Sequence, residues 1–466
     1  MYDLLIKNGR VIDPVNGVEG IKDIAIEDRR IVRVEEDIPS FSASEVLDVC
    51  GKTVIPGLVD IHTHLSPSTS RYSHRMLALA GVTAALDMSG PIDGVLRLAR
   101  EEGAGLTVAS IEALVPGANI PGLAPDSKDI EKALDEALDK GSLGIKLLAA
   151  AYLLEPDSIG NAFRIANERR AYVAAHCGSS KTNSDIRGFL EAVELAGSNR
   201  VHMAHVNSYC RGLIRPDAEE TEEAVRALID HPWLRSESYM SQMNGNSAGC
   251  ENGIPKTPVT KNCLRLGGYP ETQEGLRQAI LDGWANINIA AGGQNMLING
   301  PEAVERWLAA GTDTGVSFPV NPPLPRYRLA TAKRPDGSFV CDALSTDGGG
   351  IPRNVLVSHG LSLIRFGALS WNEYVYKTST APAKILGLPD HGSLTAGLLA
   401  NITVVDPEKQ IPVLAVSNGR LIMIGGHVCG AGSRFVTTER GERNVLENGL
   451  EPLVIHLEET GFYKGL

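Results

Sequence analysis

The sequence has no paired cysteine motif. Its seven cysteines are scattered over 466 residues, and no two of them form a C-x-x-C pair. An odd and scattered set of this kind gives neither a disulfide framework nor a thiolate zinc site. The pattern is typical of a reducing compartment, so we expect a cytoplasmic protein.

The chain also lacks an excess of positive charge and any long apolar run. Its net charge is -12 and its pI is about 5.5, which disfavours binding to phosphate backbones or to anionic membranes. No stretch approaches the roughly 20 apolar residues of a membrane span, and charge and proline come too early in MYDLLIKNGRVIDP for a signal peptide. We therefore expect a soluble protein that binds a small molecule and has neither a nucleic-acid nor a membrane partner.

Apolar material is ample, at 43% of the residues with a mean hydropathy of -0.05, and predicts a large domain with a smaller one beside it. After Pro56-Gly57, strand-like runs alternate with helical stretches. This alternation predicts parallel βαβ units and an α/β fold, a closed (β/α)₈ TIM-like barrel over residues 57–390. The strand-like runs are residues 58–62, 83–88, 106–109, 144–148, 171–176, 201–206 and 339–346.

Short strands separated by turns fill both ends of the chain. We expect residues 1–56 and 391–438 to pair into one small β-sandwich beside the barrel, because each end alone is too small to bury a face. Residues from about 237 to 340 form a long insert of the kind that shapes substrate access at a barrel rim. Residues 439–466 are a C-terminal extension with no predicted function.

The strongest chemical signal is D-I-H-T-H, residues 60–64, at the end of an apolar run. Residues two apart on a strand point to the same face, so His62 and His64 can bind one metal ion. Two unrelated surface histidines are the structural alternative.

A lysine interrupts the apolar strand G-I-K-L-L, residues 144–148. Burying its charge without a partner would cost several kcal/mol or neutralise it. Lys146 is therefore either a lysine that extends to solvent or pairs with an acid, or one whose amine has added CO₂ to become a carbamate that bridges two metals.

Three further candidates stand at the ends of other predicted strands. His176 and His205 each end an apolar run, and Asp347 precedes three glycines that allow a substrate close to the backbone. His202 lies three residues before His205, so it faces the other side and is expected in the core. Taken singly each residue has a structural explanation, but together they indicate one site at the carboxyl ends of the strands.

The motifs, read in order, resemble the dihydroorotase and hydantoinase branch of the amidohydrolase superfamily. The resemblance covers both terminal segments and most of the barrel, and leaves out much of the insert. It rests on PGLVDIHTH (56–64), ALAGVTAALDM (78–88), GIKLL (144–148), AAHC (174–177), MAHVN (203–207), STDGGG (345–350) and TAPAKILGL…GSLTAGLLANITVVDP (380–407).

The resemblance implies a metal-dependent hydrolase of C–N bonds with a binuclear centre. His62, His64 and Asp347 would hold one divalent ion, His176 and His205 the other, and carboxylated Lys146 would bridge both. A metal-bridging hydroxide would attack the carbonyl, and Asp347 would take its proton and return it to the leaving nitrogen. Zinc is the usual metal of this branch, and the ligands also suit manganese or iron. Relatives of this kind are often homo-oligomers.

The sequence departs from dihydroorotases after the paired histidines, because L-S-P-S-T-S-R-Y (65–72) replaces an Arg-Glu-Pro-Gly stretch that grips the substrate carboxylate. Arg71 is a candidate for binding an anionic group instead. Tyr152 stands near the place where hydantoinases donate to an oxyanion. Asn207 lies in H-V-N-S-Y (205–209), which resembles a formyl-hydrolysing subunit of formylmethanofuran dehydrogenase, and is a further candidate for substrate binding.

We therefore expect an enzyme that hydrolyses a small cyclic amide or an N-acyl amino acid. A formyl-amide hydrolase and a mononuclear deaminase of the same superfamily are the alternatives, and the lysine at position 146 argues against the deaminase. A non-catalytic hydantoinase-like scaffold is the third alternative, which the complete set of candidate ligands disfavours.

Overall fold

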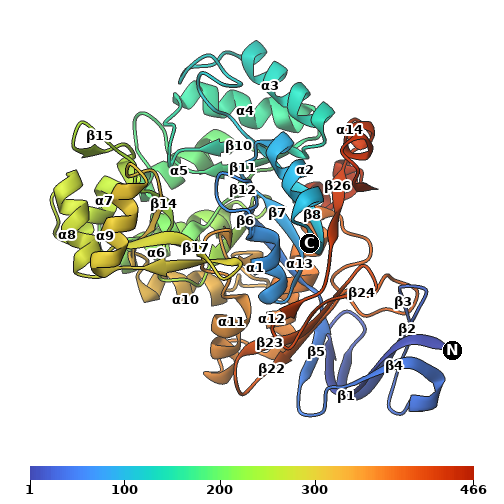
Figure 1. The fold of residues 1–466 in the computed structure, drawn as a ribbon. Coiled ribbons are helices and arrows are strands. Elements are labelled where there is room, and N and C mark those ends of the chain that lie inside the picture. Colours follow the sequence, from blue (N-terminus) through green and yellow to red (C-terminus); the bar gives the residue numbers. More distant parts are fainter.

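The computed structural model describes residues 1–466, and helices alternate with parallel strands through its central part (Figure 1). One six-stranded sheet has the order β21-β6-β7-β8-β26-β27, and a second has the order β20-β13-β12-β11-β10-β9. All pairings within both sheets are parallel. Their strands are β6 (Leu58–His64), β7 (Val82–Asp87), β8 (Ala104–Ser110), β9 (Glu112–Ala113), β10 (Gly144–Leu148), β11 (Tyr172–His176), β12 (His202–Met203), β13 (Arg235–Tyr239), β20 (Ala343–Ser345), β21 (Gly348–Gly349), β26 (Gly432–Thr437) and β27 (Glu451–Val454).

At two places, strands that are adjacent along the chain belong to different sheets. Only Ile111 separates β8 in the first sheet from β9 in the second, and only Thr346 and Asp347 separate β20 from β21. The α/β class predicted from the sequence is therefore confirmed, and the closure of these strands into a single barrel remains a prediction.

The helices between the strands are amphipathic, as α3 (Ser127–Lys140) illustrates. It buries Ile130, Ala133, Leu134, Ala137 and Leu138, which recur at helical spacing along one side. Asp126 caps its first turn in a capping box, an arrangement that stabilises a helix by about 1 kcal/mol, and Gly141 ends it in the left-handed region at φ 109°.

Figure 1 also shows the other helices outside the insert. They are α1 (Ser73–Leu79), α2 (Ile92–Glu101), α4 (Pro156–Glu168), α5 (Ile186–Ala196), α6 (Asp217–Asp230), α10 (Pro323–Thr331), α11 (Leu356–Arg365), α12 (Trp371–Val375), α13 (Ala381–Leu386), α14 (Glu442–Glu447) and α15 (Gly461–Lys464). No helix of the structure combines the length and the apolar character that crossing a membrane requires.

The two ends of the chain meet in one nine-stranded sheet. β5 from the N-terminal part pairs antiparallel with β22 from the C-terminal part, and the sheet has its own apolar core. The division of the chain into these domains remains a prediction, and β26 and β13 change two of its bounds. The strands are β1 (Tyr2–Asp13), β2 (Val18–Glu27), β3 (Arg30–Glu35), β4 (Ala43–Asp48), β5 (Thr53–Pro56), β22 (Ile402–Asp406), β23 (Ile411–Ser417), β24 (Arg420–Ile424) and β25 (His427–Val428).

One predicted element lies elsewhere than expected. We assigned residues up to 438 to the terminal β unit, but β26 pairs with β8 in the central sheet. Its adjacent residues Phe435 and Val436 are both buried, each in a different core cluster, so the strand needs cover on both faces. The C-terminal extension adds β27 beside β26, and its Phe462 stacks on Tyr172 of β11 at 4.2 Å between ring centroids.

The insert folds around a small core of its own that includes Trp307 and Phe318, and it lies on one side of the molecule (Figure 1). It begins later than predicted, because residues 235–239 form the central strand β13, whose polar sequence R-S-E-S-Y concealed it. The insert contains β14 (Asn246–Ser247), β15 (Cys250–Glu251), β16 (Ile254–Pro255), α7 (Pro258–Leu266), α8 (Gln273–Leu281), β17 (Asn286–Ala291), β18 (Gln294–Ile298), α9 (Gly300–Ala309) and β19 (Gly315–Ser317).

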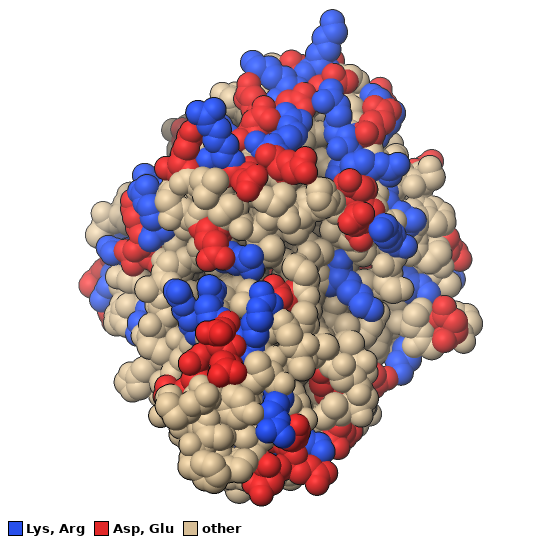
Figure 2. Space-filling view, turned by 90° about the vertical axis from the view of Figure 1, so that its right-hand side faces the viewer, with Lys and Arg blue, Asp and Glu red and all other residues tan.

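The surface charge is mixed. Figure 2 shows basic and acidic side chains interspersed over one face of the molecule. That face therefore has no extended basic surface of the kind that binds nucleic acid.

Candidate metal centre

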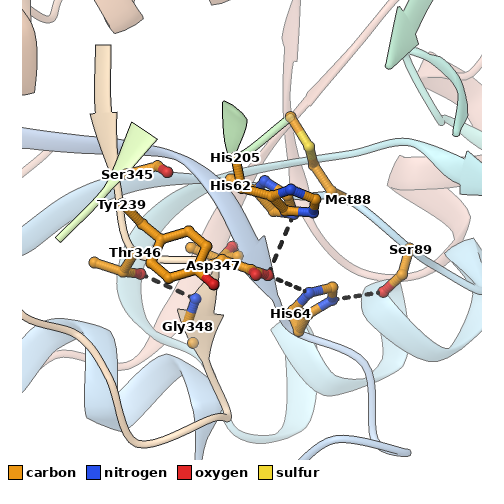
Figure 3. A network of polar contacts seen from close by, with 12 residues as sticks. His62, His64, Met88, Ser89, His205, Tyr239, Ser345, Thr346, Asp347 and Gly348 are labelled. Atoms are coloured by element: carbon orange, nitrogen blue, oxygen red, sulfur yellow. Dashed lines mark hydrogen bonds and ion pairs between the residues drawn. The ribbon is translucent and has the colours of Figure 1, made fainter. Parts of the chain in front are cut away.

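The paired histidines stand at the end of β6, a strand whose apolar residues are fully buried. His62 Nδ1 lies 2.6 Å from Glu237 Oε1, and His64 Nδ1 lies 3.0 Å from Ser89 Oγ. These contacts leave the Nε2 atoms of both rings facing Asp347, at 3.4 Å from Oδ1 for His62 and 2.8 Å for His64 (Figure 3). The predicted convergence of the two side chains is therefore found in the structure.

Two more histidines come from neighbouring strands of the second sheet. His176 ends β11, and His205 follows β12 with its backbone in the left-handed region at φ 37°. The His205 ring stacks on His62 at 5.0 Å between centroids and meets His176 edge-on at 4.4 Å. His202 is fully buried and its Nδ1 lies 2.5 Å from Tyr172 Oη, so it is a core residue, as the strand spacing predicts.

The buried histidines are held in the neutral form. Burial lowers the pKa of His62, His176 and His205 well below the usual value, and the nearby charge of Lys146 acts in the same direction. A neutral imidazole keeps a lone pair on one ring nitrogen, which is the form that binds a metal ion.

Lys146 reaches the same place from the middle of β10. It is 1% exposed, and its Nζ lies 3.3 Å from Met88 Sδ with no carboxylate at ion-pairing distance. The lysine thus neither extends to solvent nor pairs with an acid. Burial lowers its pKa to about 8, although the charges of Glu237 and Asp347 act in the opposite direction.

Asp347 lies in the two-residue connection between β20 and β21, with φ 51°. Its Oδ2 lies 2.6 Å from Arg353 Nη2, and Arg353 Nε donates to the Asp347 carbonyl. Burial alone would raise the pKa of Asp347, but the guanidinium of Arg353 and a hydrogen bond from His64 hold it well below the usual range. The carboxylate is therefore ionised.

These side chains share one cavity of about 610 Å³. Ligand atoms of His62, His205 and Asp347 lie within 4.8 Å of one another, which is close enough to hold one ion. The six predicted ligands that line the cavity are His62, His64, Lys146, His176, His205 and Asp347.

The three candidates for substrate binding differ in position. Arg71 lines the same cavity, but its side chain is exposed and pairs with Glu102. Asn207 is buried, and its side-chain oxygen accepts a 3.0 Å hydrogen bond from Tyr239 N. This oxygen therefore binds the backbone of β13. Tyr152 is absent from the cavity lining.

Sequence reasoning missed two charged residues of this centre, Glu237 and Arg353. Glu237 lies within the polar segment that we assigned to the insert, and Arg353 follows the glycines after Asp347. The available signal for Glu237 was its position, because residues 235–239 follow a helix, as do β10, β11, β12 and β20 of the same sheet. No local signal marks Arg353.

The profile of the amidohydrolase family matches residues 285–429. A dihydroorotase of Trichlorobacter lovleyi is 22% identical, with 88% of this chain and 90% of that protein covered. An L-hydantoinase of Paenarthrobacter aurescens is 24% identical, with 87% and 86% covered.

Solved structures show the same fold. N-acyl-D-glutamate deacylase from Bordetella bronchiseptica, complexed with zinc and a phosphonate inhibitor, superposes with a TM-score of 0.64 at 15% identity, over 93% of this chain and 99% of that one. D-aminoacylase, described with a binuclear metal centre, superposes with a TM-score of 0.63 at 15% identity, over 93% of this chain and 99% of that one. Over most of its length the chain is therefore similar to enzymes of the amidohydrolase superfamily that act on C–N bonds, in the dihydroorotase and hydantoinase branch.

Proposed function

We propose that this chain hydrolyses the C–N bond of a small cyclic amide or N-acyl amino acid with two divalent metal ions in the centre described above. His62, His64 and Asp347 would hold one ion, and His176 and His205 the other. Lys146, carboxylated on its amine, would contribute an oxygen to both. Zinc is the metal that we propose first.

The observation that carries the proposal is the convergence of six potential ligands from five separate strands or strand ends in one cavity. Structural histidines are more often isolated, each satisfied by its own neighbours. Here four of them surround an ionised carboxylate and a buried lysine that has no acidic partner. Such a set has no evident purpose in packing.

The chemistry of the donors fits divalent metals. Neutral imidazoles and a carboxylate are ligands for zinc, manganese and iron. Lys146 is the exception, because an ammonium cannot bind a cation. Its lowered pKa, about 8, leaves part of the amine neutral near pH 7.5 and able to add CO₂, which would convert a misplaced positive charge into an oxygen ligand.

When bound, two divalent ions would supply a water activated for attack near neutral pH and would polarise the substrate carbonyl. The protein groups then have separate tasks. Asp347 would accept the proton of the attacking water and return it to the nitrogen as the C–N bond breaks, so that nitrogen leaves as a neutral amine. Arg353 keeps this carboxylate ionised and therefore able to accept that proton.

The fold supports the same proposal. We propose that β6, β7, β8–β9, β10, β11, β12, β13 and β20–β21 close into a (β/α)₈ barrel, since β8–β9 and β20–β21 each take part in both sheets. The candidate ligands then stand at the carboxyl ends of its strands or just after them, where barrel enzymes hold their active sites. A homo-oligomeric state and a cytoplasmic location remain predictions.

The substrate class is proposed from the relatives. Two of them are named for the cyclic amides dihydroorotate and hydantoin, and a structural neighbour for an N-acyl amino acid. The test is a hydrolysis assay of zinc-loaded protein on cyclic amides and on N-acyl amino acids of the L and the D configuration. Asp347→Asn is the control. Turnover by the wild type alone supports the proposal, whereas deamination of an aminated heterocycle without any amide hydrolysis would favour a deaminase.

A further inference from the structure

Glu237 is a buried carboxylate for which the proposed reaction gives no task. It stands at the centre of β13, and its side chain is completely shielded from solvent. An ionised carboxylate at such a depth is costly unless hydrogen bonds compensate it. Its contacts therefore identify what the protein gains from keeping it.

One oxygen of Glu237 contacts two different candidate ligands. Oε1 lies 2.6 Å from the Nδ1 of His62, and it also accepts a 2.6 Å hydrogen bond from the backbone N–H of His205. These residues belong to different segments, one on β6 and one after β12.

The other oxygen contacts a third segment. Ser345 Oγ donates to Glu237 Oε2, and Ser345 ends β20 two residues before Asp347. A single side chain thus joins three of the segments that carry the candidate ligands. Figure 3 shows Ser345, His62, His205 and Asp347 gathered at this place.

We infer that Glu237 is a positioning residue for the metal centre, and the inference rests on the proposed function. By accepting the Nδ1 proton of His62, the carboxylate fixes the tautomer in which Nε2 carries the lone pair. Nε2 is the ring nitrogen that faces Asp347 and the cavity. The negative charge also makes that imidazole a stronger donor to a cation.

The bond to His205 acts on the backbone instead of the ring. His205 has a φ of 37°, in the left-handed region that a residue with a side chain adopts at a cost. Its N–H would be unpaired in the protein interior without Glu237 Oε1. The carboxylate therefore stabilises the turn that aims the His205 ring at His62 and His176.

The test compares Glu237→Gln with Glu220→Gln. Glu220 is an equally buried carboxylate that accepts three backbone N–H bonds, from Gly212, Ile214 and Arg215, and contacts no candidate ligand. Both substitutions keep the side-chain shape and remove the charge. Zinc affinity of the metal-free proteins is measured by competition with a chromophoric chelator.

We expect Glu237→Gln to bind zinc about 10- to 100-fold more weakly than the wild type, which is the usual effect of losing such a partner of a metal ligand. Glu220→Gln should bind zinc as the wild type does. Equal affinity in Glu237→Gln and the wild type contradicts the inference alone. A wild type without measurable zinc binding contradicts the proposed function, and the inference with it.

A spectroscopic measurement on the metal-free proteins separates positioning from general stability. In ¹⁵N-histidine-labelled wild type, the Nδ1–H of His62 should give a downfield proton resonance, assigned by its loss in His62→Ala. It should move upfield in Glu237→Gln and remain in Glu220→Gln. If Glu237→Gln does not fold, Ser345→Ala replaces it, with an expected loss of zinc affinity of up to about ten-fold. Unchanged affinity in Ser345→Ala would then overturn the inference.

Discussion

Arg353 and Asp347 form a buried ion pair in which the guanidinium binds both the side chain and the backbone of the aspartate. Nη2 lies 2.6 Å from Oδ2, Nε donates to the carbonyl, and the side chain of Arg353 is 2% exposed. The guanidinium also stacks over Tyr239 at 5.1 Å from the ring centroid. This arrangement fixes the orientation of the residue that we propose as the proton carrier.

Replacing Arg353 by Met should destabilise the metal-free protein. The change leaves a buried carboxylate without its counter-charge, which costs about 3 to 5 kcal/mol of unfolding free energy. Arg353→Lys keeps the charge but not the forked geometry and should lose less. Urea unfolding followed by circular dichroism measures both, and an unfolding free energy of Arg353→Met equal to that of the wild type would refute the role of the pair.

Hydrolysis should be lost in both Lys146→Ala and Asp347→Asn, for different reasons. The lysine variant lacks the oxygen that would join the two ions, so it should lose metal together with activity. The asparagine variant keeps an oxygen ligand and should retain more metal, but it has no group to carry the proton. Turnover and metal content measured on the same preparations separate the two, and full activity in either variant would disprove the mechanism.

The stability of the protein should depend on pH through Lys377, which does not line the metal cavity. It is fully buried, its Nζ donates to Cys341 O at 2.7 Å, and burial lowers its pKa from 10.5 to about 8. Between these two values the unfolded chain holds a proton that the folded chain has lost, so stability rises with pH. From the shift we expect Lys377 to contribute a rise of about 3 kcal/mol to the unfolding free energy between pH 8 and 10.5.

Lys377→Met removes the titrating group and keeps much of its apolar volume. The rise in unfolding free energy between pH 8 and 10.5 should therefore be smaller in the variant than in the wild type. Urea titrations at several pH values measure the difference. Identical pH dependence in the two proteins would show that Lys377 does not titrate in this range.

Asn295 links the insert to the edge of the metal cavity. On β18, its Nδ2 donates to Gly350 O at 2.7 Å, and its Oδ1 accepts from Ser70 Oγ at 2.9 Å. Asn295→Ala should loosen the hairpin of β17 and β18 over the cavity. We expect faster hydrogen exchange there and a higher KM with unchanged metal content.

The matched control for this change is Asn299→Ala. Asn299 donates to Asn286 Oδ1 near the far end of the same hairpin and has no contact with the cavity. Exchange in the hairpin that increases equally in both variants would contradict a specific link at Asn295.

The sequence predicted the candidate ligands because their signal is local. His62, His64 and His176 each end a strand whose apolar residues are recognisable, and the carboxyl ends of parallel strands meet at one edge. Lys146 is conspicuous because nothing in an apolar strand explains a charge. Each of these residues could be found without knowing its neighbours in space.

Glu237, Arg353 and β26 could not be found in this way. The role of Glu237 depends on three contacts with residues 32 to 175 positions away, and its polar strand has no apolar run by which it could be recognised. The role of Arg353 depends on its contact with Asp347, which no local sequence pattern predicts. The sequence of β26 resembles the short strands of the terminal sheet. Only its pairing with β8 assigns it to the central sheet.

Metal stoichiometry decides whether Lys146 joins two metal ions in one centre. Wild type and Lys146→Ala are expressed with added zinc or manganese, purified without chelator and analysed for metal per chain. We expect about two ions per chain in the wild type and a sharp fall in the variant. One ion in both proteins, or none in the wild type, would contradict this expectation.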